Sequence, residues 1–347
     1  MTMTTAPMSP TAGAIVDALA LRMLDAASPA PLSLPEPTAG PAPQPLARPS
    51  PLDSALQAAA SRQGGLGSLL ADLMVAMQAP DLPAPVAMAA AKVLALQQPA
   101  ATAPGADDLK QALAQSGLML EARLAADGAP PDEDLKAALL ILRQTLETAP
   151  AAARTDPAAP QPAPPYRGGP VQAQAAMASS LPADAATDAI LQRLLQGVEA
   201  ALARQTLMQL ASAPGAAGSP AAQTPQWLFE IPFMVPPGAA IAQLEIGRDE
   251  DEHGSAASDE AEPTWRARFS LDLDPMGPVH ARISLRGSRV RVTLWAERGA
   301  TAAQLDAQRD ALAQALLGDD LVASVAVFPG APDTPRPAAG KFMDRAL

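Results

Sequence analysis

Residues 265–296 read WRARFSLDLDPMGPVHARISLRGSRVRVTLWA, and this stretch decides the fold of the C-terminal third of the chain. Apolar and polar side chains alternate through residues 265–274, 279–286 and 289–296. A period of two over this length indicates antiparallel strands with one buried face and one polar face. Gly287-Ser288 separates the last two segments, and glycine supplies the positive φ that a two-residue hairpin turn needs. The stretch therefore predicts a sheet.

Further elements extend this sheet on both sides. Residues 226–233 and 242–246 alternate in the same way and predict two earlier strands. Thr301 with Gln304 forms a capping-box pattern that predicts a helix ending at Gly318, and residues 321–328 predict a last strand. We therefore expect an α+β C-terminal domain over residues 226–330, with an antiparallel or mixed sheet and one packed helix.

The preceding two thirds of the chain are rich in alanine and proline, with 39 Pro and 3% aromatic residues in the whole sequence. Such a composition buries little area, so we expect a largely disordered, partly helical N-terminal region. The expected order is a disordered export-signal and spacer region at 1–52, a marginal helical segment at 53–148, a Pro-rich linker at 149–183, a helix at 184–211, a linker at 212–225, the C-terminal domain at 226–330 and a flexible tail at 331–347.

Within the helical segment, apolar side chains recur at helical spacing. Leucine and methionine form stripes from Leu66 to Met77, from Leu109 to Leu124 and from Leu135 to Leu146. Asp132 is placed to cap the last of these helices.

Charge and residue usage exclude several classes of function. The net charge of −12 disfavours nucleic acid as a partner, and the absence of Cys removes thiolate chemistry. The two histidines are His253, in an acidic segment at 249–262, and His280, on the polar face of a strand. No HExxH or GxSxG motif is present, and no apolar run reaches the roughly 18 residues of a membrane span. We therefore expect no enzyme activity, no cofactor, no metal, no membrane insertion and no cleaved signal peptide.

Six arginines lie on the polar face of the predicted strands, and two interpretations remain open for them. They are Arg266, Arg268, Arg282, Arg286, Arg289 and Arg291. In the first interpretation they are a solvent-exposed face, paired across strands with Glu230, Glu245, Asp272 and Asp274. In the second they form a docking face for an acidic protein partner.

The order of these elements resembles the C-terminal domain of the flagellar hook-length control proteins, the FliK family, over residues 226–330. The resemblance lies in Leu271-x-Leu273-x-Pro275-x-Gly277-x-Val279-x-Ala281, in the hairpin that follows, in Val292-x-Leu294-Trp295-Ala296, and in the helix through Leu305, Leu312 and Leu316. Met276-Gly277 stands where the family usually has Leu-Gly.

The resemblance implies a non-enzymatic protein that stays cytoplasmic until it is exported through the flagellar type III channel. Its N-terminal part would act as a molecular ruler, in contact with hook and hook-cap proteins during export. Its C-terminal domain would contact the cytoplasmic domain of the export-gate subunit and switch export from rod and hook substrates to filament substrates. The implied switch surface comprises Pro275, Gly277, Val279, Ala281, Arg282, Arg289, Leu312 and Leu316, with the tail at Phe342, Met343 and Leu347 as a secondary candidate.

The part of the chain before the C-terminal domain, which we call the lead, is long enough to act as a ruler. A lead of about 225 residues spans on the order of 340 Å as a helix and roughly 740 Å when fully extended. The alternatives are a length-control or tether protein of another type III secretion system and a passive surface stalk.

Overall fold

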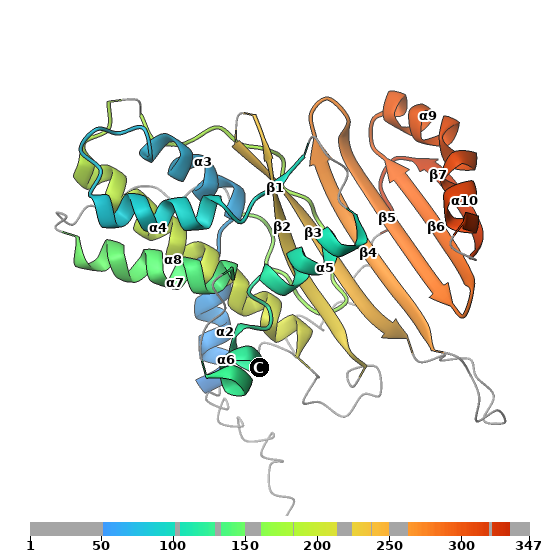
Figure 1. Ribbon diagram of the computed structural model, residues 1–347, viewed down its shortest axis with the longest axis horizontal. Coiled ribbons are helices and arrows are strands. Elements are labelled where there is room, and N and C mark those ends of the chain that lie inside the picture. Colours follow the sequence, from blue (N-terminus) through green and yellow to red (C-terminus); the bar gives the residue numbers. More distant parts are fainter. Residues whose placement is uncertain are drawn as a thin grey trace, which may run out of the picture. The chain divides into compact units, whose positions relative to one another are not determined.

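A computed structural model shows a seven-stranded mixed sheet flanked by helices (Figure 1). It describes residues 51–100, 105–128, 133–149, 161–182, 184–213, 224–236, 238–249, 263–318 and 321–333. The N-terminal spacer before residue 51, the segment at 250–262 with His253, and the tail beyond residue 333 lie outside the described residues.

The strands lie in the sheet in the order in which they occur along the chain. They are β1 (Gln98–Pro99), β2 (Gln226–Val235), β3 (Gly238–Asp249), β4 (Thr264–Leu273), β5 (Gly277–Arg286), β6 (Arg289–Ala296) and β7 (Val322–Pro329). The pairs β1–β2 and β6–β7 are parallel and the others are antiparallel. Gly287 has φ +54° in the turn that pairs Arg286 with Arg289. The structure thus confirms the α+β fold class and the mixed sheet.

Seven helices precede β2 in the described part of the chain. They are α2 (Pro51–Arg62), α3 (Leu66–Ala76), α4 (Ala84–Leu94), α5 (Ala106–Gln115), α6 (Leu120–Asp127), α7 (Leu135–Thr148) and α8 (Thr187–Ser212). The capping residue of α7 is Asp134, whose carboxylate accepts a hydrogen bond from the Ala137 N–H at 3.0 Å. The prediction that Asp132 caps this helix is wrong, because the helix begins two residues later than the pattern suggested.

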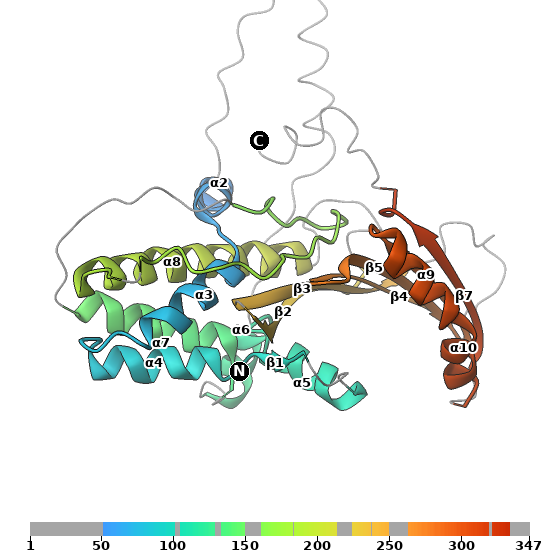
Figure 2. The same cartoon turned by 90° about the horizontal axis from the view of Figure 1, so that it is seen from above.

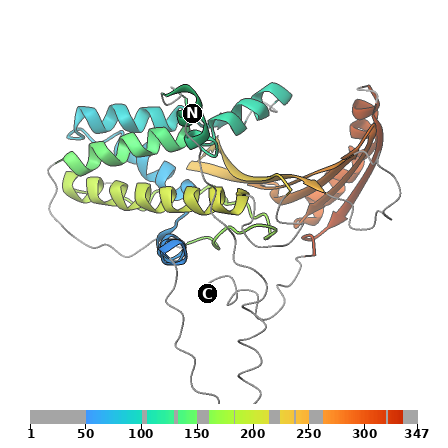
Figure 3. The same ribbon diagram turned by 90° about the horizontal axis from the view of Figure 1, so that it is seen from below.

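The largest core lies between helices and continues into the sheet. Leu70, Leu139 and Leu194 are fully buried where α3, α4, α7 and α8 pack together, and Ile241 of β3 joins the same cluster. Figure 3 shows α4, α7 and α8 as adjacent cyan, green and yellow-green helices. Burial of each leucine contributes about 1.5–3 kcal/mol of transfer free energy, which stabilises this alanine-rich helical core.

A second core lies on the opposite face of the sheet, while Leu228 of β2 packs with Met208 and Ala211 of α8 on the first face. Phe229, Ile231 and Phe233 of β2 pack with Ala112 of α5 and with Leu118. Strand β2 is therefore covered on both faces, and its residues 228–233 are all buried.

The segment 161–182 is hydrogen-bonded to the rest of the molecule at several points. Gln174 exchanges two backbone hydrogen bonds with Ile241, at 3.0 and 2.9 Å. The buried carboxylate of Asp72 accepts hydrogen bonds from Ser179 and Ser180 and pairs with Arg193 at 3.1 Å. The described part of the expected Pro-rich linker is thus fixed to β3 and α3.

Two short helices replace the single helix expected after β6. These are α9 (Gly299–Ala307) and α10 (Arg309–Gly318), and they meet at Gln308, whose N–H donates to the Leu305 carbonyl at 3.1 Å. The predicted capping box is wrong, because α9 begins at Gly299 and the Thr301 hydroxyl instead donates to the Met276 carbonyl at 2.7 Å. The second helix ends at Gly318, as predicted. Figure 2 shows α9 and α10 beside β6 and β7.

Candidate partner-binding surface

The polar face of β5 and β6 carries four exposed arginines. Three of them, Arg282, Arg289 and Arg291, we call the arginine surface, and the fourth is Arg286. The register of the two strands alternates these side chains with Ile283, Val290 and Val292 on the opposite face. The Arg282 guanidinium lies 5.6 Å from the ring centroid of Trp295. Among the described residues, none of the three forms an ion pair.

Two of the acidic residues that the sequence placed opposite the arginines, Glu245 and Glu230, have different partners in the structure. Arg268 binds the Glu245 carboxylate with two donors, at 3.0 and 2.6 Å, and this is one of the cross-strand pairs that the sequence suggested. Glu230 does not belong to this exposed face. It is buried and pairs with Arg204 of α8 at 2.8 Å.

Sequence reasoning missed a buried polar network that surrounds Arg204. Its guanidinium also donates to the Gln63 side chain at 2.9 Å and to the Ala163 carbonyl at 3.1 Å. The network thereby joins α8, β2, the α2–α3 connection and the segment at 161–182. One signal was available, because Arg204 lies three residues after Ala201, on the buried face of α8.

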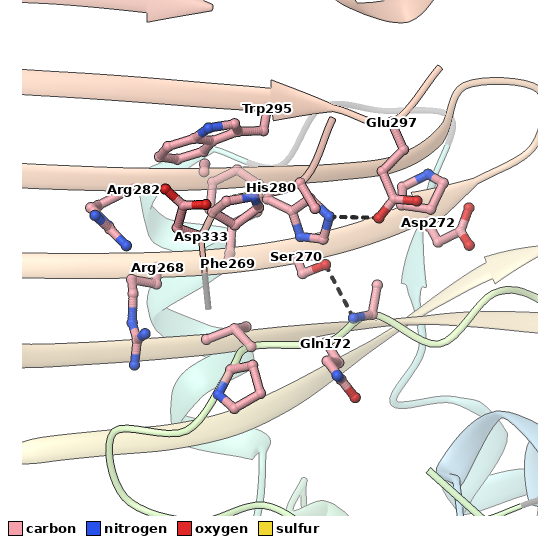
Figure 4. Close-up of a pocket in the computed structure, with 17 residues that line it drawn as sticks. Gln172, Arg268, Phe269, Ser270, Asp272, His280, Arg282, Trp295, Glu297 and Asp333 are labelled. Carbon is pink, nitrogen blue, oxygen red and sulfur yellow. Dashed lines mark hydrogen bonds and ion pairs between the residues drawn. The ribbon is translucent and has the colours of Figure 1, made fainter. Parts of the chain in front are cut away.

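A cavity of about 330 Å³ lies beside the arginine surface, over β4, β5 and β6. Figure 4 shows Arg268 and Arg282 at one end and Asp272 and Glu297 at the other. The covering walls come from residues 170–173 and 331–333. Asp333 also lines the cavity, whose lining therefore carries charges of both signs.

Several polar groups of the cavity have partners or a changed pKa. His280 lies 3.1 Å from the Glu297 carboxylate, and burial raises the pKa of Asp272 above its usual range. The Ser270 hydroxyl is fully buried and accepts a hydrogen bond from the Ala173 N–H at 3.1 Å. Ser270 thus holds the covering segment in place, and this contact gives it no activation as a nucleophile. Among the described residues, no group of three His, Asp or Glu side chains could hold a metal ion.

The turn at 274–277 joins β4 to β5 and contacts Arg298, the residue before α9. Arg298 donates to the Pro275 carbonyl and lies 3.6 Å from the Asp274 carboxylate, and the Asp274–Pro275 peptide is cis. Gly277 has φ +73°, and a Cβ there would lie 2.6 Å from the Arg298 Nε atom. Gly277 therefore fulfils a backbone and packing requirement at this turn.

The eight predicted switch-surface residues fall into three groups. Pro275, Arg282 and Arg289 are exposed, Val279, Leu312 and Leu316 are half-buried, and Gly277 and Ala281 are buried. Arg282 and Arg289 lie together on one face of β5 and β6. Leu312 and Leu316 belong to α10, which packs against β7. The structure thus does not bring all eight residues onto one exposed patch.

Comparison with known protein families identifies the C-terminal module. Residues 253–335 match the family model described as flagellar hook-length control protein FliK. These residues contain β4–β7 with α9 and α10, and they make up 83 of the 347 residues of the chain. This part of the chain is therefore similar to the C-terminal domain of the flagellar hook-length control family, in agreement with the resemblance seen in the sequence.

Two further comparisons found nothing. Neither a curated protein nor a solved structure matches the chain. Among the described helices, none is both long and apolar enough to cross a membrane.

Proposed function

We propose that the whole chain is a flagellar hook-length control protein whose C-terminal module switches the type III export apparatus from rod and hook substrates to filament substrates. The observation that carries this proposal is the family match over β4–β7, α9 and α10. The role is non-enzymatic, and the module acts by contact with a partner.

The partner is the cytoplasmic domain of the export-gate subunit, and the arginine surface is the part of the module that docks on it. Exposed charges without an intramolecular partner contribute to recognition by steering the encounter and fixing its orientation. Because the three arginines are exposed, the interaction should weaken as salt is added.

The ruler function belongs to the part of the chain before β2. In the folded chain α3, α4, α7 and α8 share a core with β3, so their residues contribute length only when this core is unfolded. The 50 residues before α2 would span about 170 Å when fully extended. Export through a narrow channel requires the helical core to unfold, and the longer reach of the full lead then becomes available.

Two variants separate the ruler from the switch. Deletion of residues 29–48 shortens an extended lead by at most about 70 Å and leaves every described contact in place. We expect shorter hooks with filaments. Reversal of charge in Arg282→Glu/Arg289→Glu should give long hooks with few filaments, whereas Arg309→Glu on α10 is the matched control and should leave hooks and filaments normal.

Electron microscopy of hooks from complemented deletion strains provides the measurement, with circular dichroism of the purified variants to show that they fold. Unchanged hook length in the deletion strain contradicts the ruler, and normal filaments in the double-arginine strain contradict the docking role of the arginine surface.

The alternative is a length-control or tether protein of another type III secretion system. In that case both variants would change a secretion needle or its substrates and leave the hook unaltered. Examination of flagella and of secreted proteins in the same strains distinguishes the two systems.

A further inference from the structure

Strand β7 forms one end of the sheet and has a single strand neighbour. The order of strands ends at β7, which pairs with β6 from Arg289↔Val322 to Ala296↔Pro329 (Figure 1). Within the described residues, no other strand pairs with its outer side.

The hydrogen bonds at the two ends of β7 identify which backbone groups face outward. The Val322 N–H donates to the Ser288 carbonyl and the Gly330 N–H donates to the Ala296 carbonyl, both at 2.8 Å. Successive residues of a strand direct their backbone groups to opposite sides, so even-numbered residues face β6. Ala323, Val325 and Val327 therefore present their N–H and C=O groups to the open side.

Before Pro329 at its end, this edge lacks the features that usually prevent pairing with another chain. Residues 322–328 read VASVAVF, without a charged residue or proline, and their register with β6 has no bulge. Sheet edges are commonly protected by charges, prolines, bulges or very short strands. The opposite edge of the sheet shows such protection, because β1 is the two-residue strand Gln98–Pro99.

We infer that the open edge of β7 binds an extended segment of another protein that alternates acidic and apolar residues. Free backbone groups in a row recognise an extended strand by hydrogen bonding, and the flanking side chains select its sequence. The inference does not depend on which secretion system the chain serves.

The arginines on one face of the sheet favour acidic residues in the bound segment. Arg289 and Arg291 of β6 lie beside Val322 and Ser324 on the arginine face, where Val322 is 63% exposed. An added strand would lie two strand spacings from β6, about 10 Å, which arginine and glutamate side chains together can span. A second copy of β7 would bring no carboxylate, because Val322–Pro329 contains no Asp or Glu. The charge of the face therefore favours a different, acidic protein over self-association.

The opposite face selects apolar residues at alternate positions of the same segment. Ala323, Val325 and Val327 are half-buried there, in register with Val290, Val292 and Leu294 of β6. Helix α10 packs against β7. An apolar side chain on this side of the added strand would extend the existing apolar row.

The test uses the full chain and a fluorescent heptapeptide, VEVEVEV, with VKVKVKV as the charge-reversed control. Binding is measured by fluorescence anisotropy at low and high salt. Val325→Pro removes one outward N–H and leaves the hydrogen bonds to β6 in place.

We expect VEVEVEV to bind the unmodified chain with an affinity at least fivefold higher than its affinity for V325P. We also expect VKVKVKV to bind at least fivefold more weakly than VEVEVEV. Ala323→Pro provides a second variant in case V325P does not fold.

Hydrogen exchange locates the binding site independently. In the free chain the amides of Ala323, Val325 and Val327 should exchange faster than those of Ser324, Ala326 and Phe328, and VEVEVEV should slow the first three. The inference would be overturned if VEVEVEV bound the folded proline variants as tightly as the unmodified chain, or if the two peptides bound equally. Slow exchange of these three amides in the free chain would also overturn the inference. If their exchange rate depends on protein concentration, a second copy of the chain covers the edge. If the rate does not depend on concentration, a segment of the same chain covers it.

Discussion

Strands β2 and β5 are both ten residues long, but they have very different surroundings. Strand β2 has six consecutive buried residues, whereas only Gly277 and Ala281 are buried in β5. The first strand is covered by α8 on one face and by α5 on the other. The second has an arginine on its exposed face, beside a cavity. The half of the sheet that matches the hook-length control family is thus the half whose polar face is covered only in part.

The two halves of the sheet differ in what they contribute to the molecule. The β2–β3 half is the attachment point for the helices, through an apolar core and the buried Arg204 network. The β4–β7 half presents charge, a cavity and an open edge. Substitutions in the first half should therefore affect mainly stability, and those on the surface of the second should affect mainly binding.

The largest effect is expected from Arg204→Ala. Removal of one partner leaves the Glu230 carboxylate buried without its counter-ion, which typically costs about 3–5 kcal/mol in the free energy of unfolding. Chemical denaturation followed by circular dichroism measures the loss. Arg268→Ala is the control, since its pair with Glu245 is more exposed and should cost less. Equal losses at the two sites would refute the contrast between the halves.

A smaller but still large effect is expected in the apolar core. Leu194→Ala creates a cavity at a fully buried position and should lower the free energy of unfolding by about 2–5 kcal/mol. Ile283→Ala in β5 should cost less, because Ile283 is only half-buried. The same denaturation experiment compares the two. A greater loss at Ile283 would place the main core in the β4–β7 half.

An intermediate effect is expected at the turn before β5. Gly277→Ala imposes a left-handed conformation on an L-residue and brings its Cβ against Arg298, at a cost of about 1–3 kcal/mol. Gly299→Ala is the matched control, because a Cβ at Gly299 meets no atom within 4 Å. Thermal unfolding should show a lower midpoint for the first variant and an unchanged or higher midpoint for the second. Similar midpoints would mean that the turn adapts to a side chain.

The smallest effect concerns the cavity. Burial raises the pKa of Asp272 in the folded chain, so the protonated carboxyl is favoured by folding. The contribution of this group to stability is therefore present below its unfolded-state pKa and is lost as the pH rises through its folded-state pKa. Asp272→Asn should remove this part of the pH dependence, which unfolding measurements between pH 3 and 7 can follow. An unaltered pH profile would show that Asp272 is solvated in the folded state.

The prediction from sequence succeeded where local pattern decides structure. The alternation in 265–274, 279–286 and 289–296 identified β4, β5 and β6, and Gly287 identified their hairpin. The prediction failed where a local motif has a tertiary competitor. Thr301 has the spacing of a capping residue, but its hydroxyl binds the Met276 carbonyl, which the fold of the turn brings beside it.

The candidate surface was predictable in part for the same reason. Strand periodicity placed Arg282 and Arg289 on one face, and the structure shows both exposed there. Periodicity could not distinguish them from Arg268, which pairs with Glu245, because that distinction depends on strand register. It also could not show that Gly277 and Ala281 are buried beneath their neighbours.

The sequence by itself determined the strands and hairpin of the C-terminal module, since alternation and turn chemistry act over a few residues. Only the tertiary structure decided that the alanine-rich helices share a core with β3, that Glu230 is buried against Arg204, and that residues 169–174 cover part of the polar face. These features join residues tens of positions apart, and their free energy comes from burial and pairing that exist only once the segments are brought together.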